Sequence, residues 1–417
     1  MLNGGLMEIS GGTIRNNNVG WRGAGIASYG KIEMTGGTIS GNYARNSWGD
    51  GGAIYLSGKK NDTGEDYTAS NASYCTIFDG NFTKNKSDGA GGAVCADGYS
   101  ILYVKGGTFE NNAAATTGGG INVYSSCLRM SDGKISGNTA VSTNGSTGFG
   151  GGLNLTAGSV ADITGGTIEN NQSNSGGGIY ANGKSSFTAS NLKITGNTAA
   201  TNGGGICIPG TKDYEYNVSL ENVLIQGNKS ESGCGAGIYA ARAWKEETST
   251  GVLTLKNCQI KENYGTVAGG GIYLDKGVTA TMDGGEISGN HVINPTSQTN
   301  GGGIAVGGTF TLNSGKISDN IKDGSWNGGA AASVSGTFTM NGGEVSGNID
   351  TCTAENAENR TIGGGAFYVL GGTLNINGGT ITNNTSHRGG AIAFHYGPYN
   401  RGTVHITGGK IVGNYVT

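Results

Sequence analysis

The stretch "GGTISGN" at 36–42 decides the fold, because similar sequences recur along the chain with small changes. A near copy, "GGEISGN", occupies 284–290, and the related "GGGI" occurs at 176–179 and 301–304. Such a phrase is either low-complexity filler or one turn of a regular structure. The spacing of the copies distinguishes the two, because a structural repeat recurs in step with other motifs.

Each repeat is marked by an apolar anchor residue that is followed three positions later by Asn. There are fourteen such copies, 25 to 43 residues apart, and each gap between them contains one Gly-rich tetrapeptide such as "GGAI" at 51–54. The strict alternation of the two motifs indicates a true structural repeat. The repeat asparagines are Asn17, Asn42, Asn85, Asn112, Asn138, Asn171, Asn197, Asn228, Asn263, Asn290, Asn320, Asn348, Asn384 and Asn414.

Hydrophobic residues keep a fixed register with the anchor. Before Ile39, for example, Met34 and Ile32 are apolar at five and seven positions upstream. Alternation with period two is typical of a strand with one buried face. The tetrapeptide begins a second strand, and the anchor lies in a third, very short one. Three strands per repeat predict an all-β fold, a single-stranded parallel β-helix of about fourteen coils that forms one continuous domain over 1–417.

The residue before the repeat Asn indicates how each coil turns. It is Gly in seven copies, Asn in four and Asp in one. These residue types tolerate the left-handed backbone conformation, so we expect a sharp bend there. The Asn after the bend is predicted to stack on the Asn of the next coil as a ladder of side-chain amides.

The composition excludes several classes of protein. Gly supplies 85 of 417 residues but Pro only 3, which excludes collagen. With a net charge of −3, the sequence shows no basic surface of the kind that binds nucleic acid. No run of apolar residues is as long as a membrane-spanning segment requires. Seven cysteines, without an adjacent matched pair, predict free thiols rather than a disulfide framework.

The paired motifs resemble the repeats of bacterial polymorphic outer membrane proteins, which carry GGA[ILV] and FxxN sequences. "GGAI" at 51–54, "GGAV" at 91–94 and "GGAI" at 389–392 match the first motif, while "FTKN" at 82–85 and "FENN" at 109–112 match the second. The resemblance covers nearly the whole chain and implies a pectate-lyase-like β-helix. The expected right-handedness rests on it and on the general preference of parallel crossovers.

An enzyme has to be considered, because β-helices of this kind include polysaccharide lyases and hydrolases. Glu8 and Glu33 occupy the same outward position of adjacent repeats, but ordinary exposed strand residues are the favoured interpretation. His387, His395 and His405 fall close in sequence without the spacing that aligns metal ligands on one strand. We therefore expect no catalytic residues, no metal and no cofactor.

Loop aromatics offer a better candidate for binding. Trp21 and Trp48 follow repeat asparagines, while Tyr214, Tyr216 and Trp244 lie in two expanded loops of consecutive repeats. Exposed rings beside charged residues suit sugar stacking or protein contact. The alternative is that these rings fold back over their own coil.

The sequence thus favours a non-catalytic bacterial protein of the cell surface, an adhesin or structural stalk that binds a polysaccharide or a surface protein. A carbohydrate-active β-helix is the main alternative, and a self-assembling filament subunit is a lesser one. Because the chain begins and ends within a repeat, we expect a piece of a longer protein, with its export signal elsewhere. The same feature predicts end-to-end self-association. No nucleic-acid partner and no membrane insertion by this segment are expected.

Overall fold

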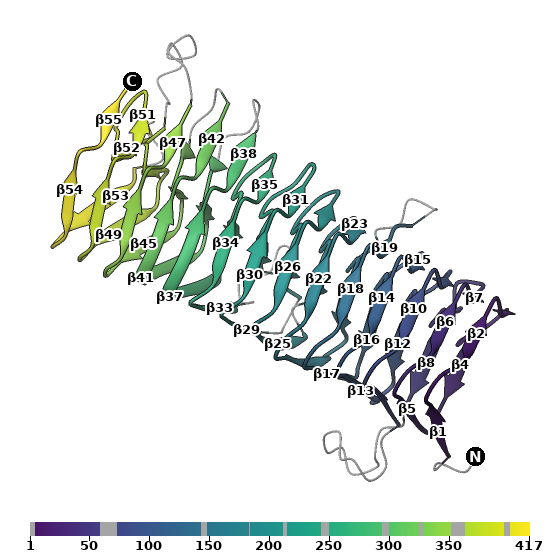
Figure 1. Cartoon of the computed structure of the whole chain (residues 1–417). Helices are drawn as coiled ribbons and strands as arrows, with labels where there is room; N and C mark the ends of the chain where they lie inside the picture. Colours follow the sequence, from purple (N-terminus) through teal and green to yellow (C-terminus); the bar gives the residue numbers. More distant parts are fainter. Residues whose placement is uncertain are drawn as a thin grey trace. The chain divides into compact units, whose positions relative to one another are not determined.

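The computed structural model describes residues 5–58, 73–142, 148–182, 184–211, 215–242, 250–293, 300–324, 328–351, 363–395 and 401–417. Every regular element among them is a β-strand, and the strands pair in parallel. The chain divides into two compact units, 1–199 and 200–417, which are described separately. Within each unit the strands stack coil upon coil (Figure 1). The predicted all-β, right-handed parallel β-helix with three sheets is confirmed.

In the first unit, sheet A consists of two rows of strands. The first row is β1 (Leu6–Ile9), β5 (Lys31–Met34), β9 (Tyr74–Ile77), β13 (Ile101–Val104), β17 (Cys127–Met130), β21 (Val160–Ile163) and β25 (Ser186–Ser190). The second row is β2 (Thr13–Arg15), β6 (Thr38–Ser40), β10 (Asn81–Thr83), β14 (Thr108–Glu110), β18 (Lys134–Ser136), β22 (Thr167–Glu169) and β26 (Lys193–Thr195).

Two further sheets complete the coils of this unit. Sheet B is β3 (Asn18–Val19), β7 (Tyr43–Ala44), β11 (Lys86–Ser87), β15 (Ala113–Ala114), β19 (Thr139–Ala140), β23 (Gln172–Ser173) and β27 (Thr198–Ala199). Sheet C is β4 (Ile26–Ser28), β8 (Ile54–Ser57), β12 (Val94–Asp97), β16 (Ile121–Tyr124), β20 (Leu153–Thr156) and β24 (Ile179–Ala181).

The second unit repeats this plan. Its sheet A strands are β29 (Tyr216–Glu221), β30 (Leu224–Gln226), β33 (Gly251–Lys256), β34 (Gln259–Lys261), β37 (Val278–Ser288), β41 (Thr309–Ser318), β45 (Thr337–Met340), β46 (Glu344–Ser346), β49 (Thr373–Ile376), β50 (Thr380–Thr382), β53 (Thr403–Ile406) and β54 (Lys410–Val412). Its sheet B strands are β31 (Lys229–Ser230), β35 (Tyr264–Gly265), β38 (His291–Ile293), β42 (Ile321–Asp323), β47 (Ile349–Asp350), β51 (Thr385–Ser386) and β55 (Tyr415–Val416).

Sheet C completes the coils of the second unit. Its strands are β28 (Ile206–Pro209), β32 (Ile238–Ala241), β36 (Ile272–Leu274), β40 (Ile304–Val306), β44 (Ala332–Val334), β48 (Phe367–Val369) and β52 (Ile392–Phe394). A small two-stranded sheet of β39 (Asn300–Gly301) and β43 (Gly328–Gly329) precedes two of them.

The third sheet is formed by residues that the sequence did not assign to a strand. Sequence analysis placed the third strand at the anchor, but the anchor strands lie in sheet A beside the preceding row. In β37 and β41 the two rows even run together as one strand. Sheet B follows the Asn instead, with strands of only two or three residues.

The predicted core positions are buried. Ile32 and Met34 of β5 are fully buried, and the anchor Ile39 is 1% exposed. In-register pairing stacks like on like across coils, so the rings of Phe82 and Phe109 lie 4.6 Å apart and nearly parallel. Each fully buried apolar side chain of this kind stabilises the fold by roughly 1.5–3 kcal/mol. The core is therefore continuous along the axis of each unit.

The Asn ladder is confirmed in both units. Asn112 Nδ2 donates to Asn138 Oδ1 at 3.0 Å, and Asn138 Nδ2 donates to Asn171 Oδ1 at 2.9 Å. The second unit continues the pattern, for example from Asn290 Nδ2 to Asn320 Oδ1 at 2.9 Å. The same Oδ1 atom also accepts the backbone N–H of the preceding ladder residue. Each buried amide thus satisfies its neighbours, as buried polar groups require.

The bend before each ladder Asn is left-handed in every copy. The φ angle is 63° at Gly137 and 55° at Asn111, and the two exceptional residues adopt the same conformation, with φ of 56° at Lys84 and 55° at Glu262. A side chain in this region costs roughly 1–2 kcal/mol. Backbone geometry at this corner therefore overrides the residue type.

Lys84→Gly is expected to stabilise the protein by about 0.5–1 kcal/mol. Glycine relieves the left-handed strain at this exposed corner, which outweighs the backbone entropy that glycine loses on folding. The measurement is a urea unfolding midpoint. The control is Lys193→Gly in β26, an exposed lysine outside the left-handed region, which is expected to destabilise by about 0.5–1 kcal/mol. A loss in both variants would contradict the strain at Lys84.

The double glycines mark corners where neighbouring backbones touch. A Cβ on Gly92 would lie 2.2 Å from the carbonyl oxygen of Gly119, and one on Gly119 would lie 2.4 Å from that of Gly151. No side chain fits at such distances, so glycine is needed there for close stacking. The six cysteines of the described ranges are free thiols, and all but Cys234 are buried.

Candidate functional site

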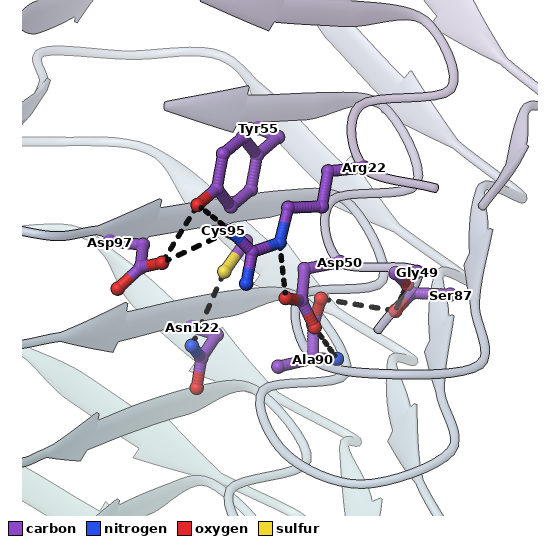
Figure 2. Close-up of polar contacts among 9 residues, drawn as sticks. All are labelled: Arg22, Gly49, Asp50, Tyr55, Ser87, Ala90, Cys95, Asp97 and Asn122. Carbon is purple, nitrogen blue, oxygen red and sulfur yellow. Dashed lines mark hydrogen bonds and ion pairs between the residues drawn. The ribbon is translucent and has the colours of Figure 1, made fainter. Parts of the chain in front are cut away.

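A cluster of polar side chains in the first unit surrounds Arg22 on the outer face of sheet C (Figure 2). The Arg22 Nη1 donates to the Tyr55 hydroxyl at 2.7 Å, and its Nε lies 3.3 Å from Asp50 Oδ2. The same Nη1 lies 3.9 Å from Asp97 Oδ2. The Tyr55 hydroxyl donates in turn to Asp97 Oδ2 at 2.7 Å.

The register of the coils brings these residues together. The second residue of a sheet C strand faces outward, so Tyr55, Cys95 and Asn122 form one column in successive coils. Asp97 ends β12, and Asp50 lies at the glycine corner before β8, where its Oδ1 accepts the Ala90 N–H at 2.9 Å. The arginine therefore connects three neighbouring coils.

The electrostatics of the cluster oppose nucleophilic chemistry. Burial raises the pKa of the Cys95 thiol well above its ordinary value, and burial together with the bond to Asp97 raises the pKa of Tyr55. Both groups stay protonated near neutral pH. Burial also raises the pKa of Asp50, although the Ala90 N–H and Arg22 oppose this. The guanidinium pairs with two carboxylates, so the cluster forms a rigid polar surface, called the floor below. It contains no activated nucleophile.

Two exposed tryptophans are close in the chain to members of this cluster: Trp21 precedes Arg22, and Trp48 lies two residues before Asp50. Trp21 is 59% and Trp48 is 62% exposed, and they lie on the loops of adjacent coils. The loops are tied together because Asn46 Nδ2 donates to the Gly20 carbonyl. The guanidinium carbon of Arg22 lies 6.0 Å from the Trp21 ring centroid and 4.8 Å from that of Tyr55. Trp21, Arg22, Trp48 and Tyr55 are called the Trp–Arg patch below.

Comparison with protein families agrees with this geometry. A family model described as a right handed beta helix region matches residues 149–313. The chain is a β-helix repeat protein. A second model, the Chlamydia polymorphic membrane protein repeat, matches residues 77–97, which contain "FTKN" and "GGAV". The repeats of this β-helix therefore resemble polymorphic membrane protein repeats, which suggests a surface or outer-membrane protein. Neither the curated proteins nor the solved structures gave a match.

The sequence predicts that Tyr216 lies in an exposed aromatic loop. The structure places it in a strand instead. It begins β29 and is only 2% exposed, with its ring packed over Gly251 of the next coil. Burial raises the pKa of its phenol. The alternation of Tyr216 with Val218 and Leu220 continues the strand pattern and explains the burial. Tyr214 and Trp244 lie outside the described residues.

The structure places several of the residues considered for catalysis or metal binding. Glu8 and Glu33 are direct neighbours in register on adjacent strands, as expected. His395 Nδ1 lies 2.7 Å from the Tyr368 hydroxyl. Over the described ranges, no group of three or more His, Cys, Asp or Glu side chains is placed to hold a metal ion. In the same ranges, no helix is long and apolar enough to span a membrane.

Sequence reasoning found the two tryptophans of the patch but missed its arginine. Asp50 follows Arg22 by 28 residues, and Asp97 follows Asp50 by 47 residues. No fixed spacing therefore connects the three. One sequence signal could have pointed to this cluster. The alternation of "GGAIYL" places Tyr55 on the outward face of its strand.

Proposed function

We propose that this β-helix is a non-catalytic adhesin of the bacterial cell surface that binds glycans through the Trp–Arg patch. The observation that supports this most is the exposure of Trp21 and Trp48 on adjacent, hydrogen-bonded loops. Two large exposed rings on loops that are bonded to each other are more than singly scattered apolar residues, and grouped exposed apolar surface marks interaction sites.

The floor beneath the rings suits a hydroxyl-rich ligand. Arg22 is held by Tyr55 and Asp50, so its orientation is set before any ligand arrives. Such a preorganised donor loses little side-chain entropy on binding. A sugar would stack its C–H face on a tryptophan and direct hydroxyls to the guanidinium and to Asp97.

Surface display is the second part of the proposal. The polymorphic membrane protein repeat suggests a surface or outer-membrane location. A stack of coils that shares one Asn ladder would act as a stalk that presents the patch. Extracellular exposure follows from this proposal and can be tested by protease shaving of intact cells that produce the protein.

Replacing Trp21 and Trp48 together with Ala is expected to lower binding on a glycan array at least tenfold, because both stacking platforms are removed. The matched control is Tyr124→Ala, another exposed aromatic (50%) at the end of β16 in the same unit. Circular dichroism checks that both variants keep the fold. Equal binding by the double variant and the wild type would contradict the proposed site.

Incubation with polysaccharides separates the adhesin from the alternative, a carbohydrate-active enzyme. The purified chain is incubated with a panel of polysaccharides, with and without calcium. We expect no new reducing ends and no unsaturated products. Turnover of any polysaccharide would show that the protein is an enzyme and would overturn the non-catalytic part of the proposal.

A further inference from the structure

An interrupted stack of aromatic rings runs along the outer face of sheet C in the second unit. Tyr239 and Tyr273 are neighbours in register, and their rings stack at 5.2 Å with 6° between their planes. The next two positions of the same column are Ala305 and Ser333, before Tyr368 restores a ring. Two successive coils therefore lack a ring, and the face of Tyr273 away from Tyr239 has no aromatic neighbour in this column.

The interruption produces a hollow of about 290 Å³. Its walls include Tyr273, Asp275 and Lys276 from one coil and Ala305, Ser333 and Ser335 from the next two. This volume is at the low end of small-ligand pockets, which are roughly 300–1,000 Å³. The hollow therefore has the size of a site for a small ligand.

The polar groups around the hollow converge without partners. Within the described part of the chain, no hydrogen bond or ion pair engages the carboxylate of Asp275, the ammonium group of Lys276 or the hydroxyls of Ser333 and Tyr273. Ser333 is nonetheless only 5% exposed. Lys276 is exposed and Asp275 and Tyr273 are half-buried, and none of these polar atoms is both buried and unpaired, so solvent reaches them. They are therefore available to a polar ligand that enters the hollow.

We propose that this hollow binds a neutral pyranose ring that stacks on Tyr273 and occupies the place of the ring missing at Ala305. Successive strands are about 4.8 Å apart, so a flat ring one coil beyond Tyr273 would lie at stacking distance. Asp275 accepts hydrogen bonds from sugar hydroxyls, while Lys276 and Ser333 donate to sugar oxygens.

A neutral sugar fits this charge pattern better than an ion. Asp275 and Lys276 are adjacent and opposite in charge, so the hollow has no net charge with which to select an anion or a cation. Both groups instead form strong hydrogen bonds to hydroxyls, because one partner is charged. The inference shares the glycan class with the proposed function but uses other residues, in the other unit.

Saturation-transfer NMR of the whole chain tests the proposal. The probes are the methyl glycosides of glucose, galactose, mannose and N-acetylglucosamine. At least one of them is expected to show saturation transfer at millimolar concentration. Ala305→Tyr places a ring on Tyr273 and is expected to weaken that binding at least tenfold. Asp275→Asn, which removes the charge but keeps the shape, is expected to weaken it about tenfold.

The matched control is Ala393→Tyr. Ala393 continues the same outward column but lies beyond Tyr368, one coil past the hollow, so this variant is expected to bind like the wild type. Absence of saturation transfer to all four probes, or equal binding by wild type and Ala305→Tyr, would overturn the proposal. Trp21→Ala separates the two sites, because it leaves the hollow intact. Its effect on array binding reports on the Trp–Arg patch alone.

Discussion

Replacing Lys322 with Met is expected to lower the free energy of unfolding by about 3–5 kcal/mol. Lys322 of β42 and Asp350 of β47 are neighbours in register on the inner face of sheet B, with both side chains at 0% exposure. Their Nζ and Oδ1 atoms are 3.1 Å apart. Methionine keeps the length of the side chain but leaves the Asp350 carboxylate buried without its cation. Urea unfolding followed by circular dichroism measures the loss.

An exposed ion pair in the same two coils provides the control. Lys316 and Glu344 are 3.6 Å apart with side chains 43% and 45% exposed, so Lys316→Met is expected to change stability by no more than about 1 kcal/mol. The double variant Lys322→Met, Asp350→Leu should recover most of the stability, because no buried charge remains. Similar losses in the Lys322 and Lys316 variants would show that burial does not determine the effect.

The repeat could be predicted from the sequence because its signals are local. Ile39 and Asn42 keep a fixed spacing in every copy, and alternation at Ile32 and Met34 defines which face is buried. The residue before the Asn must adopt the left-handed backbone conformation. The frequent Gly, Asn and Asp at this position reveal that requirement in the sequence. Parallel stacking then follows, since only neighbouring coils can cover the apolar face of each strand.

The third sheet could not be predicted because its strands are too short to carry a period. β7 contains only Tyr43 and Ala44, so alternation over four or more residues cannot be recognised. The same limit hid the buried Lys322, whose position in β42 points inward. A lysine in a short polar stretch is normally expected to be exposed to solvent. Only the pairing register with the neighbouring coils shows that Lys322 is buried.

The polar cluster around Arg22 depends on contacts between coils of unequal length. The loops that bring Arg22 and Asp50 together differ in length from those that position Asp97, so spacing along the chain carries no signal. The exposed tryptophans could be found because aromatic residues in polar loops stand out by composition. Tyr216 could not be separated from them by composition, whereas its alternation with Val218 would have placed it in a strand.

Asn138→Ala is expected to destabilise the first unit by about 2–6 kcal/mol, the largest effect of the single substitutions proposed in that unit. Asn138 Oδ1 accepts the backbone N–H and the side-chain amide of Asn112 at 2.9 and 3.0 Å. Its Nδ2 donates to Asn171 Oδ1 and to the Phe109 carbonyl, both at 2.9 Å. Alanine removes all four bonds in a fully buried site. Asn112 Nδ2 still donates to the Phe82 carbonyl, and Asn171 Oδ1 still accepts the backbone N–H of residue 138. The Asn112 N–H and the Phe109 carbonyl lose these side-chain partners, and each buried group left unpaired costs about 1–3 kcal/mol.

The corner of the preceding coil provides the control. Asn111 precedes ladder residue Asn112 and has a φ of 55°, so Asn111→Gly keeps the bend and is expected to change stability by about 0.5 kcal/mol at most. The two variants therefore separate the hydrogen-bonded ladder from the backbone bend. Urea midpoints and amide hydrogen exchange at Asn112 report the difference. A loss of less than about 1 kcal/mol in Asn138→Ala would mean that the ladder amides add little beyond what water offers them in the unfolded chain. The stacked apolar core would then carry the stability of the coils.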